Sequence, residues 1–380
     1  MSAHHRSPEA GIGFGLIGTG FMGRAHAIAL NEVAAVFPEV SVPRCVCVVD
    51  RDEARAAEAQ TELRFARYST DWRSLLDDPE IGALSVCTPN HLHFEMALGA
   101  VQAGKHVLCE KPLTLTVTEA EQLASAAKQA GVVHLVGFNY ITNPLLQLAR
   151  EIIRSGEIGE PISFSGRYFE DYMASPEVPY SWRCERRLAG SGALADLGSH
   201  LINMLHFLLS PPVRVRGHIR TVIEERREPN SGKRLPVENE DIALAQFELA
   251  SGIPANLEIS RVATGYKCGL QCEIFGTAGS IRFDQERMNE LKLYRSDDAA
   301  GRRGFRTILV GPEHPDLARF CPAPGHGLGI NDLKVIEMRN FLRAIQEGQA
   351  AYPDFEEGLR VQRVMEAIEA SSGEDGWIGI

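Results

Sequence analysis

The sequence predicts an α/β protein: an N-terminal doubly wound parallel sheet, followed by a C-terminal α/β domain with a large, mostly antiparallel open sheet. Three observations lead to this fold class. A glycine-rich turn follows the apolar run 12–17. Strand and helix patterns then alternate as far as residue 136, which is typical of a parallel sheet covered by helices. From residue 213 onward, alternating strand patterns follow one another with few helices between them, which indicates an antiparallel sheet.

The glycine-rich turn is the first element to explain. Gly18, Gly20 and Gly23 have the spacing G-x-G-x-x-G, between a strand pattern and a helix pattern that begins near residue 23. Amide groups at a helix N-terminus attract anions, and glycine lets a pyrophosphate approach the backbone. Taken alone, the three glycines could simply serve a tight turn. The flanking strand and helix favour a dinucleotide site.

An acidic residue, Asp50, ends the next apolar run. A carboxylate at that place bonds the ribose hydroxyls of NAD and repels the 2′-phosphate of NADP. The interval from Gly23 to Asp50 is longer than the usual one of about 20 residues, and we assign the excess to a loop that contains Pro38 and Pro43. NAD is therefore predicted as the cofactor. NADP remains the alternative, because the adjacent Arg51 could pair with a phosphate.

The first third of the chain should contain further parallel strands and helices. Strands are predicted at 12–17, 44–49, 83–88, 106–109 and 132–136. Helices are predicted at 23–33, 52–63, 71–76, 92–103 and 117–130. Ligands bind such sheets at the carboxyl ends of the strands, so the residues that follow each strand are candidates for a site.

One of these strand ends reads Thr88-Pro89-Asn90. Because proline cannot extend a central strand, the chain turns there and leaves Thr88 and Asn90 facing the nucleotide. His91 and His93 lie two residues apart, so they do not share a helix face. We expect ordinary surface or capping histidines at these positions rather than a metal pair.

Another strand end reads Glu110-Lys111-Pro112. Pro112 holds Lys111 away from helical geometry, at the edge of the sheet where ligands bind. A lone lysine is usually a solvated surface charge. Its place between a buried strand and a proline favours a functional role for Lys111.

The second half of the chain begins with a helix pattern at 143–155 and a strand pattern at 162–169. The segment 172–187 is rich in aromatic residues and arginines, and suits a substrate pocket, a core or an oligomer interface equally well. Later strands are predicted at 213–224, 242–249, 253–261, 269–275, 280–283 and 291–294, and helices at 331–347 and 355–371. Helices would cover one face of this sheet, and self-association would cover the other.

Asp196 and His200 are spaced i, i+4 at the start of an apolar helix pattern that runs to residue 209. On a helix they share a face, so the carboxylate can orient the imidazole. An acidic residue near a helix N-terminus beside a core histidine is an equally good interpretation of this pair alone. A metal site would need a third ligand at suitable spacing, and the sequence offers none.

Composition narrows the function classes. The net charge of −11 argues against partners such as nucleic acid or an anionic membrane surface. The eight cysteines form no C-x-x-C pair and lie partly in apolar strand patterns, as expected in a reducing compartment. Residues 1–10 lack the apolar core of a signal peptide, and no apolar run approaches the length of a membrane helix. We expect a soluble cytoplasmic protein.

Together these motifs resemble the glucose–fructose oxidoreductase and inositol dehydrogenase family. The resemblance runs from about residue 12 to the last helix, and is closest to inositol dehydrogenases and related pyranose dehydrogenases. The motifs that it rests on are the glycine turn, Thr88-Pro89-Asn90, Glu110-Lys111-Pro112, Gly137-Phe138-Asn139-Tyr140, Trp182-Arg183, Asp196-x-x-x-His200 and the turn at 276–280.

The resemblance implies a Rossmann NAD(P)-binding domain at 1–140 and a substrate-binding and oligomerisation domain at 141–380, in a homodimer or homotetramer. It implies an oxidoreductase that transfers a hydride between a secondary hydroxyl of a cyclitol or pyranose sugar, of inositol or glucose type, and the nicotinamide cofactor. His200 would be the general base, Asp196 would orient it, and Lys111 would hydrogen-bond the reacting oxygen.

Further site residues follow from the same resemblance. The candidate cofactor-binding residues are Gly18, Gly20, Phe21, Met22, Gly23, Asp50, Arg51, Thr88, Asn90, His93, Glu110, Lys111, Asn139, Trp182 and Arg183. The candidate substrate-binding residues are Lys111, Tyr168, Asp171, Tyr172, Arg183, Asp196 and His200. No metal site is predicted.

Two other function classes stay open at this point. Some members of the family bind cofactor as regulators without turnover, although the presence of Lys111, Asp196 and His200 favours an enzyme. A metal hydrolase that uses His91, His93 and His200 is poorly supported.

Overall fold

The computed structural model describes residues 11–374 and 376–380. Residues 1–10, where the sequence shows no signal-peptide core, lie outside the described part. The chain divides into two compact units. Unit 1 contains the residues up to Leu113, Thr118–Asn139 and Gly329–Gly358. Unit 2 contains Thr114–Val117, Tyr140–Leu328 and Leu359–Ile380. That residues 1–140 bind the cofactor and residues 141–380 bind the substrate and form the oligomer stays a prediction.

Unit 1 is built on a parallel sheet of six strands in the order β3-β2-β1-β4-β5-β6. The strands are β1 Gly13–Ile17, β2 Arg44–Val49, β3 Arg67–Ser69, β4 Ala83–Val86, β5 His106–Cys109 and β6 His134–Val136. Every neighbouring pair runs parallel. The chain leaves β1 for β2 on one side and later crosses to β4 on the other, which makes the doubly wound sheet that the alternating pattern predicts.

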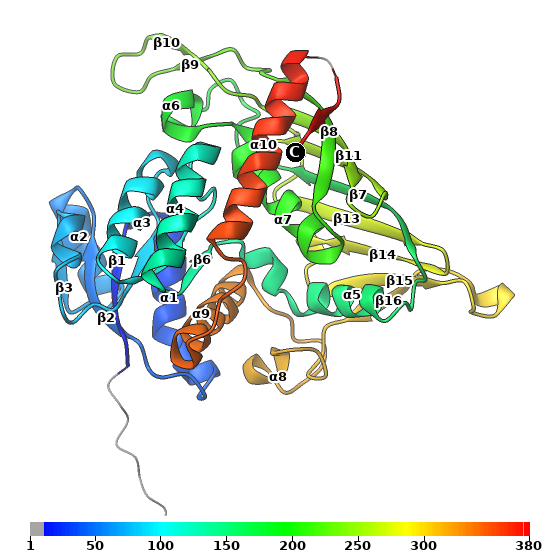
Figure 1. Ribbon diagram of the computed structural model, residues 1–380, viewed down its shortest axis with the longest axis horizontal. Coiled ribbons are helices and arrows are strands. Elements are labelled where there is room, and N and C mark those ends of the chain that lie inside the picture. Colours follow the sequence, from blue (N-terminus) through cyan, green and yellow to red (C-terminus); the bar gives the residue numbers. More distant parts are fainter. Residues whose placement is uncertain (1–10, 375) are drawn as a thin grey trace, which may run out of the picture. The chain divides into compact units, whose positions relative to one another are not determined.

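Helices pack against this sheet. They are α1 Phe21–Val36, α2 Glu53–Glu62, α3 His93–Gln102, α4 Val117–Ala130 and α9 Ile330–Glu347, with short 3-10 helices at Trp72–Leu75, Asn90–Leu92 and Asn139–Thr142. Helix α9 comes from late in the chain and packs against α1 (Figure 1). Its Phe341 meets Phe14 of β1 edge to face, with ring centroids 6.2 Å apart. A late helix therefore completes the core of unit 1.

The structure corrects two details of the first third. The segment 71–76, expected to be a helix, is a single 3-10 turn in which Asp71 caps the amide of Arg73. The edge strand β3 was not predicted, because three residues of mixed burial are too few to show a period of two.

Unit 2 is built on a mixed sheet of nine strands in the order β16-β15-β14-β13-β7-β12-β11-β8-β17. Its strands are β7 Pro161–Phe169, β8 Pro212–Arg220, β11 Ile242–Leu249, β12 Pro254–Ser260, β13 Gly269–Gly276, β14 Gly279–Asp284, β15 Glu290–Arg295, β16 Arg306–Leu309 and β17 Ile378–Gly379. Only the pair of β7 and β12 is parallel among these neighbours; the other pairs are antiparallel. The fold class predicted for this part is confirmed.

Helices cover one face of the large sheet, here called the inner face. They include α5 Pro144–Arg154, α7 Ser199–Leu208 and α10 Phe355–Glu374. A Cβ on Gly166 of β7 would lie 3.2 Å from the Leu201 side chain of α7, and one on Gly217 of β8 would lie 2.5 Å from the Ile368 carbonyl oxygen of α10. Shorter helices are α6 Arg186–Ala189, α8 Leu317–Phe320, and 3-10 turns at Trp182–Cys184, Gln285–Arg287 and Ala300–Arg302.

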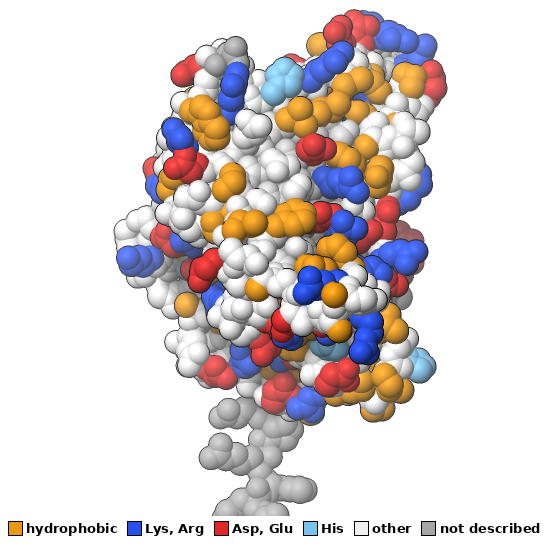
Figure 2. All heavy atoms as spheres, turned by 90° about the vertical axis from the view of Figure 1, so that its right-hand side faces the viewer, with side chains coloured by type: hydrophobic (Ala, Val, Ile, Leu, Met, Phe, Trp, Pro, Cys, Tyr) orange, Lys and Arg blue, Asp and Glu red, His pale blue; other side chains and the backbone are white. Residues whose placement is uncertain are grey.

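The opposite, outer face is exposed. Along β11 every second residue points to it, and Leu244 keeps 41% of its surface exposed. Figure 2 shows this side of the sheet, with charged side chains of both signs and hydrophobic ones among them. Alternation of buried and exposed residues is what a sheet with one covered face produces.

The strand expected at 213–224 is shorter than predicted. It ends at Arg220 because the amides of Val222 and Ile223 donate to the Asp241 carboxylate instead of a neighbouring strand. A separate hairpin follows, formed by β9 Glu225–Arg227 and β10 Arg234–Pro236. Among the described residues, no helix combines the length and the apolar character that a membrane span requires.

Candidate cofactor and catalytic sites

The backbone geometry of the glycine turn in unit 1 shows why glycine is needed there. Gly18 has φ +97°, in the left-handed region that favours glycine. A Cβ there would lie 2.5 Å from the Cys87 carbonyl oxygen, and a Cβ on Gly23 would lie 2.0 Å from the Gly18 carbonyl oxygen. A Cβ on Gly20, the N-cap of α1, would meet nothing within 4 Å. Gly18 and Gly23 thus allow the turn to close, while Gly20 leaves open space before the first amides of α1.

Asp50 lies at the end of β2 beside this turn. Its Oδ2 accepts the Thr19 hydroxyl at 2.5 Å, and the Arg55 guanidinium approaches the same oxygen at 3.3 Å. Burial raises the pKa of Asp50, but hydrogen bonds from Thr19 and Asp52, with the charge of Arg55, outweigh it and lower the pKa. Asp50 is therefore an anion. The arginine that contacts it is Arg55, not the Arg51 that the sequence suggests.

His93 is buried, which corrects the expectation of a surface histidine. Its Nδ1 lies 2.7 Å from the Pro112 carbonyl oxygen, and its Nε2 lies 2.8 Å from the Thr88 carbonyl oxygen. Burial lowers the pKa of His93, whereas both carbonyls favour a protonated ring. His93 therefore lies between the carbonyl groups that follow β4 and β5, with one ring nitrogen close to each.

Glu110 and Lys111 follow β5. The Glu110 carboxylate turns into unit 1, where it contacts His26 at 2.8 Å and Lys334 at 2.6 Å. The backbone amide of Lys111 donates to the same carboxylate at 3.2 Å. Asn139, at the exit of the neighbouring strand β6, is buried as well. The cofactor role of Glu110 stays a prediction, and its contacts with the Lys334 ammonium and the His26 imidazole hold it within unit 1.

The residues of unit 1 fit a dinucleotide cofactor. The turn leaves room at the N-terminus of α1, and an anionic carboxylate stands at the end of β2 for ribose hydroxyls. Phe21, the first residue of α1, keeps 75% of its surface exposed, as an apolar side chain beside a ligand site would. Met22 is half-buried and Arg51 exposed.

The catalytic candidates of unit 2 lie on one irregular helix. Leu194–Gly198 forms a π-helical turn that continues directly into α7, so Asp196 lies in the turn and His200 in the first turn of α7. Such turns inside helices are frequent at functional sites. His200 is only 7% exposed, and Asp196 is half-buried.

Tyrosines surround this pair. The Tyr172 hydroxyl donates to Asp196 Oδ2 at 2.6 Å. The Tyr140 ring lies 4.5 Å from the His200 ring, and the Tyr140 and Tyr168 hydroxyls are 2.9 Å apart. Burial raises the pKa of all three tyrosines well above the usual value, so they stay neutral. The structure thus brings Tyr168 and Tyr172, both predicted, to Asp196 and His200, and adds Tyr140.

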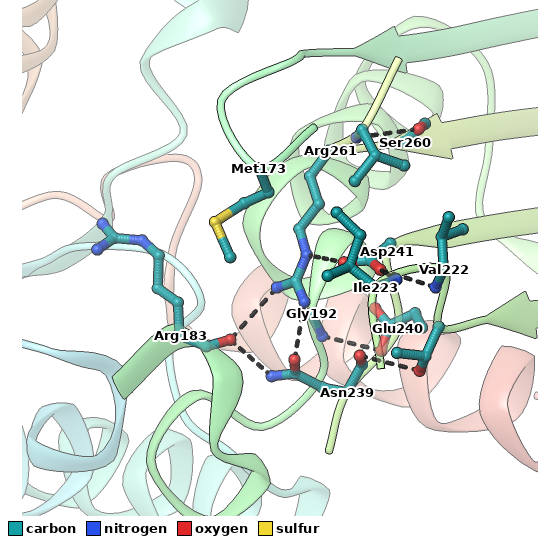
Figure 3. A network of polar contacts seen from close by, with 12 residues as sticks. Met173, Arg183, Gly192, Val222, Ile223, Asn239, Glu240, Asp241, Ser260 and Arg261 are labelled. Carbon is teal, nitrogen blue, oxygen red and sulfur yellow. Dashed lines mark hydrogen bonds and ion pairs between the residues drawn. The ribbon is translucent and has the colours of Figure 1, made fainter. Parts of the chain in front are cut away.

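Asp171 and Arg183 have different surroundings. Asp171 pairs with Lys267 at 2.7 Å and accepts the amide of Gly265, so its carboxylate is already engaged within unit 2. The Arg183 guanidinium lies over the Trp182 ring, 4.5 Å from its centroid. In Figure 3 the Arg183 side chain points away from the buried network behind it. A substrate role for Asp171 and a binding role for Trp182 and Arg183 stay predictions.

A buried network of polar side chains binds the backbone of two segments, the start of the helix with Asp196 and the Trp182–Cys184 turn (Figure 3). Glu240 accepts the amides of Gly192 and Leu194 at 2.9 and 2.8 Å, just before the π-helical turn. Arg261 donates to Asp241 at 2.8 Å and to the Arg183 carbonyl oxygen at 3.3 Å. Glu240 and Asp241 directly precede β11, and Arg261 directly follows β12. They fix where the helix with Asp196 begins and where the Trp182–Cys184 turn lies.

Comparisons with known proteins agree with this picture. Residues 12–138 match the model described as "Oxidoreductase family, NAD-binding Rossmann fold". Residues 146–282 match the "GFO/IDH/MocA C-terminal domain". The chain is 37% identical over 382 residues to levoglucosan dehydrogenase of Pseudarthrobacter phenanthrenivorans, which covers 97% of this chain and 98% of that protein.

Two further relatives extend the comparison. The scyllo-inositol 2-dehydrogenase (NAD(+)) of Bacillus subtilis is 31% identical over 269 residues, which is 70% of this chain and 72% of that protein. A solved levoglucosan dehydrogenase in complex with NADH and L-sorbose superposes with a TM-score of 0.95 at 38% identity, covering 98% of this chain and 99% of that one. The family suggested by the sequence motifs is confirmed, and NAD is the cofactor of this fold. The chain belongs to the GFO/IDH/MocA family of NAD-binding oxidoreductases.

Proposed function

We propose that this protein oxidises a secondary hydroxyl of a pyranose sugar or cyclitol with NAD as the hydride acceptor. The observation that supports it most strongly is the buried His200 next to the rings of Tyr140 and Tyr168, on the same helix as an Asp196 that accepts the Tyr172 hydroxyl. A histidine so placed is suited to proton transfer, and alcohol oxidation needs a group that takes the hydroxyl proton. The 37% identity with a levoglucosan dehydrogenase supports a sugar ring as substrate.

We assign the binding of the cofactor to the glycine turn and Asp50, with Thr88, Asn90 and Asn139 at the neighbouring strand ends. Bound NAD supplies the electron-accepting ring. The open space at Gly20 admits the pyrophosphate, and the Asp50 carboxylate accepts hydrogen bonds from ribose. Arg55 neutralises part of the Asp50 charge, so the preference for NAD over NADP rests on the balance of these two residues.

Proton transfer is assigned to His200. Its imidazole takes the proton of the substrate hydroxyl, and the Asp196 carboxylate stabilises the imidazolium that results. Tyr172 donates to Asp196 and so fixes the direction of that carboxylate. Lys111 is proposed to donate a hydrogen bond to the same substrate oxygen and to stabilise its developing negative charge.

The substrate is proposed to be a neutral polyhydroxylated six-membered ring. Levoglucosan is the first compound to test, because a levoglucosan dehydrogenase is 37% identical to this chain. Inositols and glucose follow. A site built around several hydroxyl groups rejects analogues that lack one, since its buried polar groups are then left unpaired.

The experiment is a panel of levoglucosan, inositols, hexoses, deoxy-sugars, sugar acids and short alcohols at equal concentration, with NADH formation as readout. We expect the highest kcat/KM for a neutral ring polyol and a lower value for its deoxy analogue. If sugar acids or short alcohols give the highest kcat/KM, the proposed substrate class is wrong.

We also propose a cytoplasmic homodimer or homotetramer that uses the outer face of the large sheet. The eight cysteines are all free thiols, which suits a reducing compartment. Leu244 is an exposed apolar residue on an interior strand of that face. Light scattering should give a multiple of the chain mass for the wild type and a lower mass for Leu244→Glu; a monomeric wild type would contradict the proposal.

A further inference from the structure

Four buried titratable side chains of unit 1 form what we call the Glu110 cluster: His26, Glu110, Lys334 and Glu337. Their exposed fractions are 0%, 4%, 1% and 1%. His26 lies on α1, Glu110 follows β5, and Lys334 and Glu337 lie on α9. The proposed chemistry uses none of these four, yet Lys111 is the residue next to Glu110.

The two oxygens of the Glu110 carboxylate have separate partners. Oε1 accepts from Lys334 Nζ at 2.6 Å and from His26 Nε2 at 2.8 Å. Oε2 accepts the backbone amide of Lys111 at 3.2 Å. Because the carboxylate can only accept, His26 carries its proton on Nε2, and its Nδ1 accepts the Ser85 hydroxyl at 2.5 Å. One oxygen is thus anchored by cation and imidazole, and the other is directed at Lys111.

The same carboxylate also abuts the end of β6. A Cβ on Gly137 would lie 2.6 and 2.9 Å from the two Glu110 carboxylate oxygens, and the Gly137 amide donates to the Cys109 carbonyl oxygen at 2.8 Å. Glu110 therefore lies between the C-terminal ends of β5 and β6, which are followed by Lys111 and Asn139, respectively. The carboxylate thus lies close to the backbone of both segments.

The charge of Glu110 depends on Lys334. Burial raises the pKa of Glu110, but the Lys334 ammonium and the His26 hydrogen bond outweigh it and hold that pKa well below the usual range. Lys334 also bonds Glu337 at 2.8 Å, which fixes its ammonium on α9. A buried carboxylate without its cation would take up a proton, and a carboxyl O–H is a donor that cannot serve the Lys111 amide in the same way.

We propose that Lys334 is a positioning residue for Lys111, acting through the Glu110 carboxylate. The inference rests on the function proposed for Lys111. It gives a function to the buried Lys334 of α9, a helix that belongs to unit 1 although it follows residues 140–328 of unit 2 in the sequence. It also assigns to the acidic residue of Glu110-Lys111-Pro112 the task of holding the backbone of the catalytic candidate.

The test compares Lys334→Met, Lys334→Arg and Glu110→Gln with the wild type. In Glu110→Gln the amide oxygen is drawn to Lys334 and His26, which places the amide nitrogen against the Lys111 N–H. Lys105→Met is the control, since Lys105 likewise makes two hydrogen bonds within unit 1, to backbone carbonyls, but lies just before β5, at the end of that strand away from Lys111. The full-length protein is used throughout.

The first readout is hydrogen–deuterium exchange of the peptide that contains Lys111, which needs no substrate. We expect faster exchange in Lys334→Met and Glu110→Gln, near-normal exchange in Lys334→Arg, and no change there in Lys105→Met. Unchanged exchange in Glu110→Gln overturns the inference. If Lys334→Met does not fold, Glu110→Gln and Lys334→Arg still decide it.

The second readout is turnover. A small misplacement of Lys111 should lower kcat on the order of 100-fold, with a much smaller change in NAD affinity and recovery in Lys334→Arg. In the Lys111→Met background, Glu110→Gln should cost no further activity, because both act through one residue. If the losses of activity in Lys111→Met and Glu110→Gln multiply in the double variant, the inference is overturned. A wild type that oxidises none of the panel refutes the proposed function, while the exchange data still judge the role of Lys334.

Discussion

Arg261→Met is predicted to destabilise unit 2 more than any exposed charge substitution in that unit. Arg261 is 1% exposed and donates to Asp241 at 2.8 Å, to Asn239 at 2.9 Å and to the Arg183 carbonyl oxygen at 3.3 Å. Asp241 is fully buried. The methionine keeps much of the aliphatic volume of arginine but leaves the Asp241 carboxylate without its cation (Figure 3).

The size of the effect follows from that geometry. Removing one partner of a buried ion pair costs about 3–5 kcal/mol, because the other charge stays buried and uncompensated. Asp241 still accepts two backbone amides, from Val222 and Ile223, so the lower end is expected. For a unit of this size each kcal/mol lowers Tm by roughly 2–4 °C, which gives a decrease of roughly 6–12 °C for 3 kcal/mol.

Scanning calorimetry and urea unfolding measure this loss. Arg214→Met is the control, because Arg214 pairs with Glu248 across an exposed strand pair and such pairs contribute about 1 kcal/mol or less. The double variant Arg261→Met/Asp241→Asn should cost less than the two single losses added, since the uncompensated charge is gone. Equal losses for Arg261→Met and Arg214→Met would refute the view that this network holds the backbone of the site.

Three further predictions concern the proton acceptor, the cofactor and acid stability. His200→Ala should lower kcat by about 100- to 10,000-fold, with partial recovery at high pH where hydroxide replaces the base; an unchanged rate and pH profile would make His200 structural. NAD should give a higher kcat/KM than NADP, and Asp50→Ala should reduce that ratio because Arg55 is then free to pair with a 2′-phosphate; a preference of the wild type for NADP would contradict this. Burial lowers the pKa of His106 and His134, so the folded state binds fewer protons than the unfolded chain. The stability they contribute is present above about pH 6.5 and declines as the pH falls through the folded pKa, by at most about 1.4 kcal/mol per pH unit for each group. Urea unfolding from about pH 8 to about pH 5 should show this decline, and His106→Gln/His134→Gln should flatten it; equal slopes would count against it.

The parts of the site that the sequence could predict are those that local patterns encode. Gly18 is required by its positive φ and Gly23 by the close approach of the Gly18 carbonyl oxygen, both within one turn. Asp50 ends a strand whose apolar pattern is clear. The i, i+4 spacing likewise predicted that Asp196 and His200 belong to one helix. It did not reveal the π-helical turn, because the extra residue in that turn leaves no mark on a pattern of apolar side chains.

Other features depend on contacts between distant segments and could not be predicted from one sequence. Lys334 reaches Glu110 across 224 residues, and in an amphipathic helix pattern it looks like one more surface lysine. The buried His93 lies against the Pro112 carbonyl oxygen, which belongs to the next strand end of the sheet and is not part of the local pattern around His93. Polar residues buried by distant partners show no hydrophobic periodicity, so they are missed by analysis of patterns.

Lys111 and His200 are proposed to serve hydride transfer from a ring polyol to NAD. The most direct test is Lys111→Met, measured by kcat with the best substrate of the panel and by the dissociation constant of NAD. Loss of a positioned electrostatic donor should lower kcat by about 100- to 1000-fold, with NAD affinity largely intact. If Lys111→Met turns over at a rate close to that of the wild type, Lys111 does not serve the reaction.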